Sequence, residues 1–290
     1  MVKVSKAVSG FRSVGYSVKV AKEVGFQKFL QSANSKNTCK TCAYGMGGQN
    51  GGMRNEAGNY PEVCKKSLQA QITDLQPAIP EEILTSSLSG LRQHPPRELE
   101  RLGRLNTPLL KTRDHNHFQI VSWDEALSRI SERFKSQPAH RTFFYSSGRS
   151  SNEAAFLLQI FARVFGTNNV NNCSYYCHQA SGVGLAKTIG SGAATVVLDD
   201  VKHADMIWVL GANPSSNHPR FMTELLHCRR RNGQVIVINP LREPGLVKFK
   251  VPSDWRSMVL GDCEIASTYI QPNIGGDIAL LNGVAKVLIE

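Results

Sequence analysis

The chain has 290 residues, of which 41% are apolar and 20% are charged, and its formal net charge is +11. A chain of this length can bury a sizeable core in more than one domain, and no stretch approaches the ~20 apolar residues that a membrane-spanning helix needs. The basic residues are spread along the chain without a compact Lys/Arg block or a basic–aromatic repeat, which argues against a nucleic-acid partner.

Residues 1–38 are predicted to form a basic arm with one weak amphipathic helix. The arm has neither the continuous apolar run of a secretory signal nor a twin-Arg pair. We expect a cytoplasmic protein, and the Lys/Ser-rich start, with no acidic residue before Glu23, leaves an organellar transit peptide as the alternative. Seven cysteines, an odd number, argue against a disulfide framework.

Residues 39–122 are predicted to be an iron–sulfur-type and connecting region. Cys39, Cys42 and Cys64 lie in a stretch with too many glycines to bury a core by itself, and thiolates on such a loop suit zinc or an iron–sulfur cluster. Zinc would want a fourth Cys or His close to Cys64, and the nearest beyond it is His94. A cluster is therefore favoured, with unligated thiols as the alternative.

Residues 123–290 are predicted to form an α/β domain. WDEAL opens a helix after the N-cap Ser122, and a second helix is expected over 151–165, with Ser150 and Glu153 at capping-box spacing. Further helices are expected near Cys177 and over 219–232, where Arg229-Arg230-Arg231 suits the negative end of the helix dipole.

Four short apolar runs alternate with these helices and are predicted to be strands: RTFFYS, ATVVL, DMIWVLG and QVIVIN. Continuous apolar strands of this kind predict a doubly wound, mostly parallel, Rossmann-like sheet that is covered on both faces. The chain ends inside the amphipathic helix IALLNGVAKVLIE, without a Gly or Asn stop signal, so we expect the domain to be truncated at its C-terminus.

Two features of this domain are typical of a binding site. Cys177 and His178 stand together near a helix start, where the positive end of the dipole favours a thiolate, although by composition alone a structural Cys beside a structural His is at least as plausible. The turns ANPSSNHP and NPLREPG follow two of the strands, at the edge where doubly wound sheets bind ligands. Neither turn contains GxGxxG, so a nicotinamide cofactor gains no support.

With these residues assembled, the chain resembles the molybdopterin oxidoreductases related to formate dehydrogenase catalytic subunits, in particular the cytoplasmic "oxidoreductase alpha subunit" branch. The resemblance extends over nearly all of residues 35–290. It rests on ordered blocks: FYSSGRSSNEAAFLLQIFARVFGTNNV, NNCSYYCHQASGVGLAKTIG, GANPSSNHPRFM, VIVINPLREPGL and GGDIALLNG.

The resemblance implies a molybdenum (or tungsten) bis(molybdopterin guanine dinucleotide) cofactor, with Cys177 as the thiolate ligand of the metal and His178 taking a substrate-derived proton. It implies a small, formate-like substrate and an iron–sulfur cluster, of the 4Fe-4S type, that passes electrons to an acceptor protein or subunit. Lys66 matches the position between cluster and pterin. The remaining cofactor-binding residues implied are Ser147, Arg149, Asn152, Asn213, Ser216, Asn239 and Arg242.

Two departures from the family pattern bear on these expectations. Met46 stands where the cluster motif has its third cysteine, which leaves Cys39, Cys42 and Cys64, so the cluster has a non-Cys ligand, lacks one iron or is absent. Family chains also run far beyond residue 290, so we expect this chain to be inactive alone. The alternatives are a relative acting on another small substrate and a non-catalytic metal- or nucleotide-binding fragment.

Overall fold

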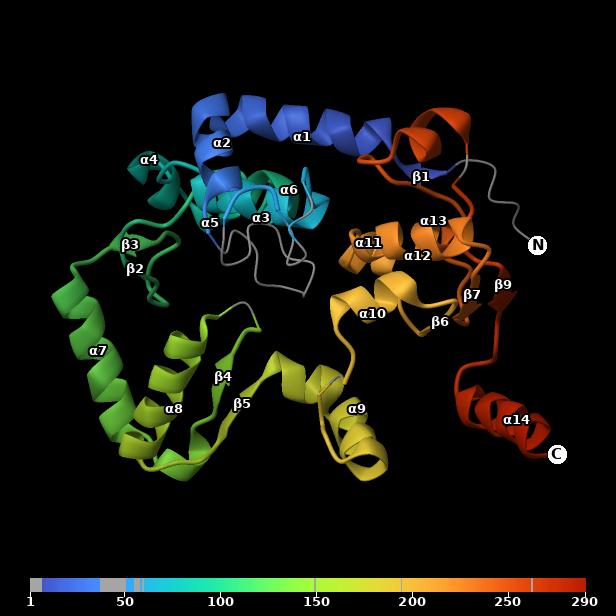
Figure 1. The fold of residues 1–290 in the computed structure, drawn as a ribbon. Helices are drawn as coiled ribbons and strands as arrows, with labels where there is room; N and C mark the ends of the chain where they lie inside the picture. Colours follow the sequence, from blue (N-terminus) through green and yellow to red (C-terminus); the bar gives the residue numbers. More distant parts are fainter. Residues whose placement is uncertain are drawn as a thin grey trace. The chain divides into compact units, whose positions relative to one another are not determined.

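The computed structural model describes residues 7–36, 51–54, 58, 60–148, 150–193, 195–261 and 263–290 (Figure 1). The chain divides into two compact units, which are treated separately below. Unit 1 comprises Met1–Ile72 and Val196–Glu290, and unit 2 comprises Thr73–Thr195. The domain boundaries that the sequence suggests, after residues 38 and 122, stay predictions.

Unit 1 is built around a three-stranded parallel sheet in the order β6-β7-β9. The strands are β6 (Met206–Leu210), β7 (Gln234–Ile238) and β9 (Thr268–Ile270). A second, two-stranded parallel sheet joins β1 (Val8–Ser9) to β8 (Phe249–Lys250). The helices that belong wholly to unit 1 are α1 (Phe11–Val24), α2 (Phe26–Asn34), α10 (Leu198–His203), α11 (Pro214–Asn217), α12 (Phe221–Arg230), α13 (Pro244–Val247), the π-helical turn η2 (Arg256–Leu260) and α14 (Asp277–Ile289).

The core of unit 1 lies between this sheet and α12. Strands β6 and β7 contribute alternate apolar side chains, and α12 contributes the residues that repeat with its helical period. These side chains are at most 9% exposed, and they are Ile207, Val209, Met222, Leu225, Leu226, Cys228, Val235 and Val237, joined by Leu246, Phe249, Val251 and Ile265.

Unit 2 has a smaller core made of aromatic rings. Phe134 and Phe144 stack with their ring centroids 5.9 Å apart, and the rings of Phe161 and Phe165 pack edge-on against both. The strands of unit 2 are β2 (Leu109–Leu110), β3 (Gln119–Ile120), β4 (Phe144–Ser146) and β5 (Val170–Asn172). Its helices are α4 (Glu81–Leu84), α5 (Leu88–Leu91), α6 (Pro96–Leu99), α7 (Trp123–Ser136), the 3-10 turn η1 (Ala139–Arg141), α8 (Asn152–Phe165) and α9 (Cys173–Ile189), while α3 (Lys65–Leu75) crosses the boundary between the units.

The expected single doubly wound sheet is not confirmed. The described strands form four small sheets, three of them parallel and the β2-β3 pair antiparallel. The run ATVVL does not form the expected strand, because Val197 instead precedes α10 and its backbone N–H donates to the Asp200 carboxylate at 2.8 Å. The expectation of burial on both faces also fails for β6, where Met206 and Leu210 are exposed.

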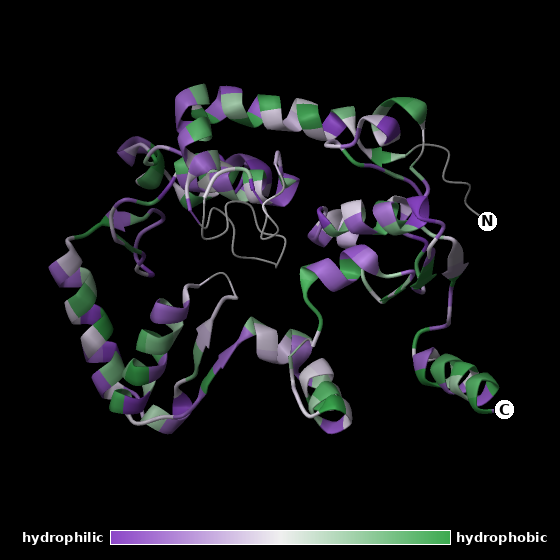
Figure 2. Ribbon diagram, in the orientation of Figure 1, coloured by the Kyte–Doolittle hydropathy of each residue, from purple (hydrophilic) through white to green (hydrophobic). Residues whose placement is uncertain are grey.

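Helix starts follow the sequence prediction to within a turn. Ser122 caps α7 by accepting the Glu125 backbone N–H at 3.1 Å, as expected. The cap of α8 is Ser151 and not Ser150, one residue later than predicted. Figure 2 shows that α14 is largely apolar. None of its described residues is buried, so α14 adds nothing to the core. No helix in the described part of the chain combines the length and apolar character needed to cross a bilayer.

A mostly buried ion pair joins the N-terminal part of unit 1 to α12. The Nε of Arg220 lies 3.1 Å from the Glu62 carboxylate, and the two side chains are 5% and 14% exposed. Burial raises the pKa of Glu62, an effect that the Arg220 charge opposes and the nearby Glu224 carboxylate reinforces. The Arg220 charge thus offsets the repulsion between the mostly buried carboxylates of Glu62 and Glu224.

A second ion pair fastens the C-terminal end of α12. The guanidinium of Arg230 donates two hydrogen bonds to Asp254, one of them 2.9 Å long, and the Asp254 carboxylate also accepts the Ser257 backbone N–H at 2.8 Å. Arg230 is the main reason that the pKa of Asp254 lies below its ordinary value. The basic run at the end of α12 therefore contributes an ion pair within unit 1, through Arg230 and Asp254.

We expect Arg220→Met to lower the free energy of unfolding by about 3–5 kcal/mol, the typical cost of stranding a buried charge without its partner. Glu62→Gln removes a charge instead of stranding one, so it should cost less. Urea unfolding followed by circular dichroism measures both, with the exposed Lys19→Met as a control expected to change stability by no more than about 0.5 kcal/mol. Equal losses for Arg220→Met and the control would contradict the assigned role of the pair.

We expect Asp254→Asn to destabilise the chain by about 1–3 kcal/mol at neutral pH, since hydrogen bonds to a charged group are lost. Because the folded-state pKa is depressed, the contribution of Asp254 is present above the ordinary carboxyl pKa of about 4 and is lost as the pH falls through the folded value. Urea unfolding from pH 7 down to pH 3 should show the two proteins converging in acid. A difference that stays constant across this range would refute the assignment.

Candidate functional site

Cys177 and His178 lie on α9 in unit 2, and both are exposed. The helix begins at Cys173 because the Asn172 side chain caps it, accepting the Tyr175 backbone N–H at 3.0 Å. The sequence suggested that Cys177 lies near the start of this helix. In the structure Cys177 lies one turn after the start of α9. Since the dipole acts mainly within the first turn, that argument applies to Cys173 more than to Cys177.

The turn after β4 approaches the start of α9. Strands β4 and β5 run parallel with Ser146 opposite Asn172, so both chains leave the sheet at the same edge. There the backbone N–H of Gly148 donates to the sulfur of Cys173 at 2.9 Å. A Cβ atom at Gly148 would lie only 2.7 Å from that sulfur, which explains why a residue without a side chain stands there.

The predicted residues of unit 2 are thus gathered at one edge of β4-β5. Ser147 precedes Gly148 in the turn, Asn152 is the first residue of α8, and both are exposed. Arg149 lies outside the described residues. The structure brings the turn to the beginning of the helix that carries Cys177, through the sulfur of Cys173.

In unit 1, the two predicted turns lie side by side because β6 and β7 are parallel neighbours. The Asn239 side chain donates to the Ala212 carbonyl at 3.3 Å and accepts the Leu241 N–H at 3.0 Å, which ties one turn to the other. The Oδ1 of Asn213 accepts the hydroxyl of Ser215 at 2.7 Å and the N–H of Ser216 at 3.2 Å. Asn213, Ser216 and Asn239 therefore meet at the carboxyl edge of the sheet, as predicted.

Arg242 extends from the second turn over the ring of Tyr269, 5.3 Å from its centroid. Its Nε is buried and makes no hydrogen bond among the described residues. The Tyr269 hydroxyl donates to the Leu241 carbonyl at 2.6 Å and accepts the Glu243 N–H at 2.9 Å, and burial raises the pKa of this phenol. Tyr269 thus fixes the turn that carries Arg242 and stays protonated at neutral pH.

Sequence reasoning did not identify Gly148, Cys173 or Tyr269 as site residues. Their roles depend on contacts between segments that are 25 residues apart for Gly148 and Cys173 and 28 residues apart for Tyr269 and Leu241. A signal existed only for Cys173, which follows two asparagines at a helix start and so resembles a capped N-terminus.

The predicted cluster residues are only partly described. Cys64 is buried at the start of α3, with 9% of its surface exposed, and Lys66 follows on the exposed side of that helix. Cys39, Cys42 and Met46 lie outside the described residues. Within the described ranges, no three His, Cys, Asp or Glu side chains gather as a metal site.

Comparison with known proteins places these residues in a family context. The family model described as "Molybdopterin oxidoreductase" matches residues 104–290. Protein YdeP of Escherichia coli is 39% identical over 236 residues, which cover 79% of this chain and 31% of YdeP. An uncharacterized oxidoreductase of Mycobacterium tuberculosis is 40% identical over 205 residues, covering 70% of this chain and 26% of that protein.

A formate dehydrogenase alpha subunit of Methanococcus maripaludis is 34% identical over 188 residues, or 64% of this chain and 25% of the subunit. The chain therefore spans about a quarter to a third of the length of these relatives. Among solved structures, acetylene hydratase from Pelobacter acetylenicus aligns with 48% of this chain and 20% of its own, at 19% identity and a TM-score of 0.39. A likeness that low supports no conclusion about this chain.

We expect Gly148→Ala to destabilise unit 2 by about 1–3 kcal/mol, because the new Cβ would overlap the Cys173 sulfur. Cys173→Ala removes that sulfur, so the double variant should recover part of the loss, and a double-mutant cycle measures the coupling. Thermal unfolding of the four proteins provides the data. Strictly additive effects would show that the turn and α9 do not meet through this sulfur.

Proposed function

Because the chain belongs to the molybdopterin oxidoreductase family, we propose that it is part of an oxidoreductase whose molybdenum or tungsten is held by pterin dinucleotides and by the thiolate of Cys177. The observation that carries this proposal is the match over residues 104–290, which contains Cys177, His178 and both turns at the carboxyl edge of β6 and β7. The full activity is proposed for a protein of the length of the relatives, of which the aligned part of this chain covers 26% and 31%.

The residues present are suited to such a cofactor. The turn after β7 offers the positive charge of Arg242, whose buried Nε has no partner among the described residues. A diphosphate is an acceptor that a guanidinium binds well. The exposed thiol of Cys177 is a soft sulfur donor of the kind that molybdenum and tungsten sites use in this family, and it forms no disulfide.

The proposed assignments extend to the other residues named from the resemblance. Asn213, Ser216 and Asn239, with Arg242, hold a pterin dinucleotide at the edge of β6-β7. Ser147, Arg149 and Asn152 serve the same cofactor and the substrate from the turn after β4. When bound, the metal cofactor supplies a two-electron acceptor, and His178 beside Cys177 takes the proton that the substrate releases.

The proposed substrate is formate or a similar small molecule. Its oxidation to carbon dioxide releases two electrons and one proton, and the proposal assigns the proton to His178. Cys39, Cys42 and Cys64 are proposed to hold an iron–sulfur cluster of the 4Fe-4S type, with Lys66 between cluster and pterin, that passes the electrons singly to an acceptor protein. The 34% identity to a formate dehydrogenase subunit favours formate over other small substrates. A cytoplasmic location is part of the proposal.

A second candidate is a metal- or nucleotide-binding piece of such an enzyme without turnover of its own. The coverage favours it for the isolated chain, which corresponds to about a quarter of the formate dehydrogenase subunit. The two candidates differ in one respect. Only the first predicts that the protein expressed from its complete reading frame reduces a dye with formate.

The deciding experiment measures molybdenum, tungsten, iron, zinc and acid-labile sulfide in that complete protein. We expect molybdenum or tungsten together with iron and sulfide, and zinc alone would exclude the proposal. Cys177→Ser should abolish formate-dependent dye reduction and leave the iron content near normal, since the cluster cysteines are untouched. Lys187→Met, in the last turn of the same helix, is the control and should retain activity. Full activity of Cys177→Ser would remove Cys177 from its proposed role.

A further inference from the structure

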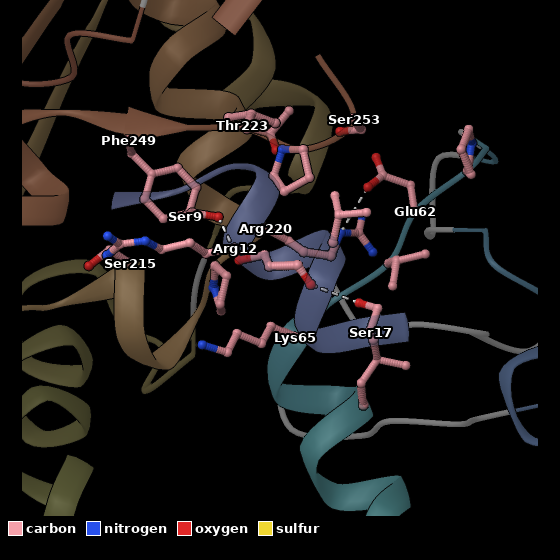
Figure 3. Close-up of a pocket in the computed structure, with 18 of the residues that line it drawn as sticks. Ser9, Arg12, Ser17, Glu62, Lys65, Ser215, Arg220, Thr223, Phe249 and Ser253 are labelled. Carbon is pink, nitrogen blue, oxygen red and sulfur yellow. Dashed lines mark hydrogen bonds and ion pairs between the residues drawn. The ribbon is translucent and has the colours of Figure 1, made fainter. Parts of the chain in front are cut away.

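Unit 1 contains a pocket of about 630 Å³ whose lining includes none of the residues assigned above, although its Lys65 stands between Cys64 and Lys66 and its Ser215 donates a hydrogen bond to Asn213. It is enclosed by α1 and α2, by the segment that leads into α3, and by α11, α12 and β8 (Figure 3). The volume falls within the range of about 300–1,000 Å³ that is usual for small-molecule sites.

The N-terminal arm forms one side of this pocket and is held there by its backbone. Strand β1 pairs with β8, with hydrogen bonds from Val8 N–H to the Lys248 carbonyl and from Gly10 N–H to the Lys250 carbonyl, both 3.1 Å long. The Glu62–Arg220 ion pair holds the opposite side. The pocket is therefore formed by ordered backbone pairing and a mostly buried ion pair.

Most of the wall is apolar. Side chains from both the arm and the sheet side contribute to it, among them Val14, Phe29, Met53, Leu68, Pro219 and Val251. An apolar wall of this extent favours the hydrocarbon or aromatic part of a ligand over water.

One side of the pocket is cationic. Figure 3 shows Arg12 from α1 and Lys65 from α3 extending toward the same side, where Ser215 of α11 also lies. Neither cation forms an ion pair with a carboxylate in the described part of the chain, although the Lys65 ammonium lies 5.1 Å from the centroid of the Tyr16 ring. Among the described residues that line the pocket, the acidic side chain is Glu62, and it is already paired with Arg220.

We propose that this pocket binds an amphipathic organic anion, a carboxylate with an apolar body. The carboxylate lies between Arg12 and Lys65, and the apolar body lies along Val14, Phe29 and Leu68. An inorganic anion would leave the apolar wall uncovered, and an uncharged apolar molecule would leave the two cations without an anionic partner. The site does not depend on the proposed oxidoreductase activity, and no step of that activity uses it.

The test is isothermal titration calorimetry of the 290-residue chain with sodium decanoate, with inorganic phosphate and 1-decanol as comparison probes. We expect saturable decanoate binding at one site, and binding of phosphate and decanol at least about tenfold weaker. Absence of decanoate binding would overturn the proposal. Phosphate binding as tight as decanoate would overturn it too, because the apolar wall would then play no part.

Three variants locate the binding within the pocket. Arg12→Gln with Lys65→Gln should weaken decanoate binding by about tenfold or more, as expected when two charged donors are lost, whereas Lys19→Gln, also on α1 but outside the pocket, should not. Val14→Trp adds bulk to the wall and should weaken binding without changing the charge. Thermal unfolding of each variant identifies any that fails to fold. Decanoate binding that is unchanged in both folded pocket variants would refute the site.

Discussion

The parallel pairing of β6 with β7, under the apolar face of α12, is the interaction on which unit 1 depends. It buries alternate side chains of both strands against Leu225 and Leu226, and each such side chain contributes about 1.5–3 kcal/mol. The same pairing makes both strands end at one edge. The turns that carry Asn213 and Asn239 must therefore lie together, so the position of the candidate dinucleotide site follows from the packing of the core.

Two ion pairs extend this core to segments far away in the sequence. Arg220, near the start of α12, holds the segment that leads to Cys64, while Arg230, at its end, holds the turn at Asp254. Arg220 is the residue before α12 and Arg230 is its last residue, and the apolar face of this helix covers the sheet. A buried arginine of this kind is specific as well as stabilising, since its donors match a carboxylate in one orientation only. The two ends of α12 thus position the segment that leads to Cys64 and the loop after β8.

The sequence predicted the features that depend on local pattern. Ser122 caps its helix as expected, because capping needs only a hydroxyl and the next few backbone N–H groups. Two of the expected strands pair in parallel as β6 and β7, since a dense apolar run of that length indicates a buried strand. The gathering of Asn213, Ser216 and Asn239 followed from the rule that such strands end at one edge.

Features that depend on tertiary contacts were not predictable. Val196 and Val197 have the composition of a strand, but Asp200 caps the backbone there and a helix follows. Tyr269 locks the turn beside Arg242 from a strand 28 residues away, and no local pattern indicates it. The start of α9 was misplaced by one turn, because the cap is set by the hydrogen bond from the Tyr175 backbone N–H to Asn172, which the sequence pattern did not indicate.

The pairing of β1 with β8 has a consequence for how the chain acquires its structure. Unit 1 is discontinuous, with unit 2 inserted between its two segments. In it, Val8 near the N-terminus pairs with Phe249, which is far away in the sequence. During synthesis the arm leaves the ribosome long before its partner strand exists. Unit 2 is one continuous stretch and can fold first. Closure of unit 1 needs the later segment, and its contacts between residues far apart in the sequence make that step slow.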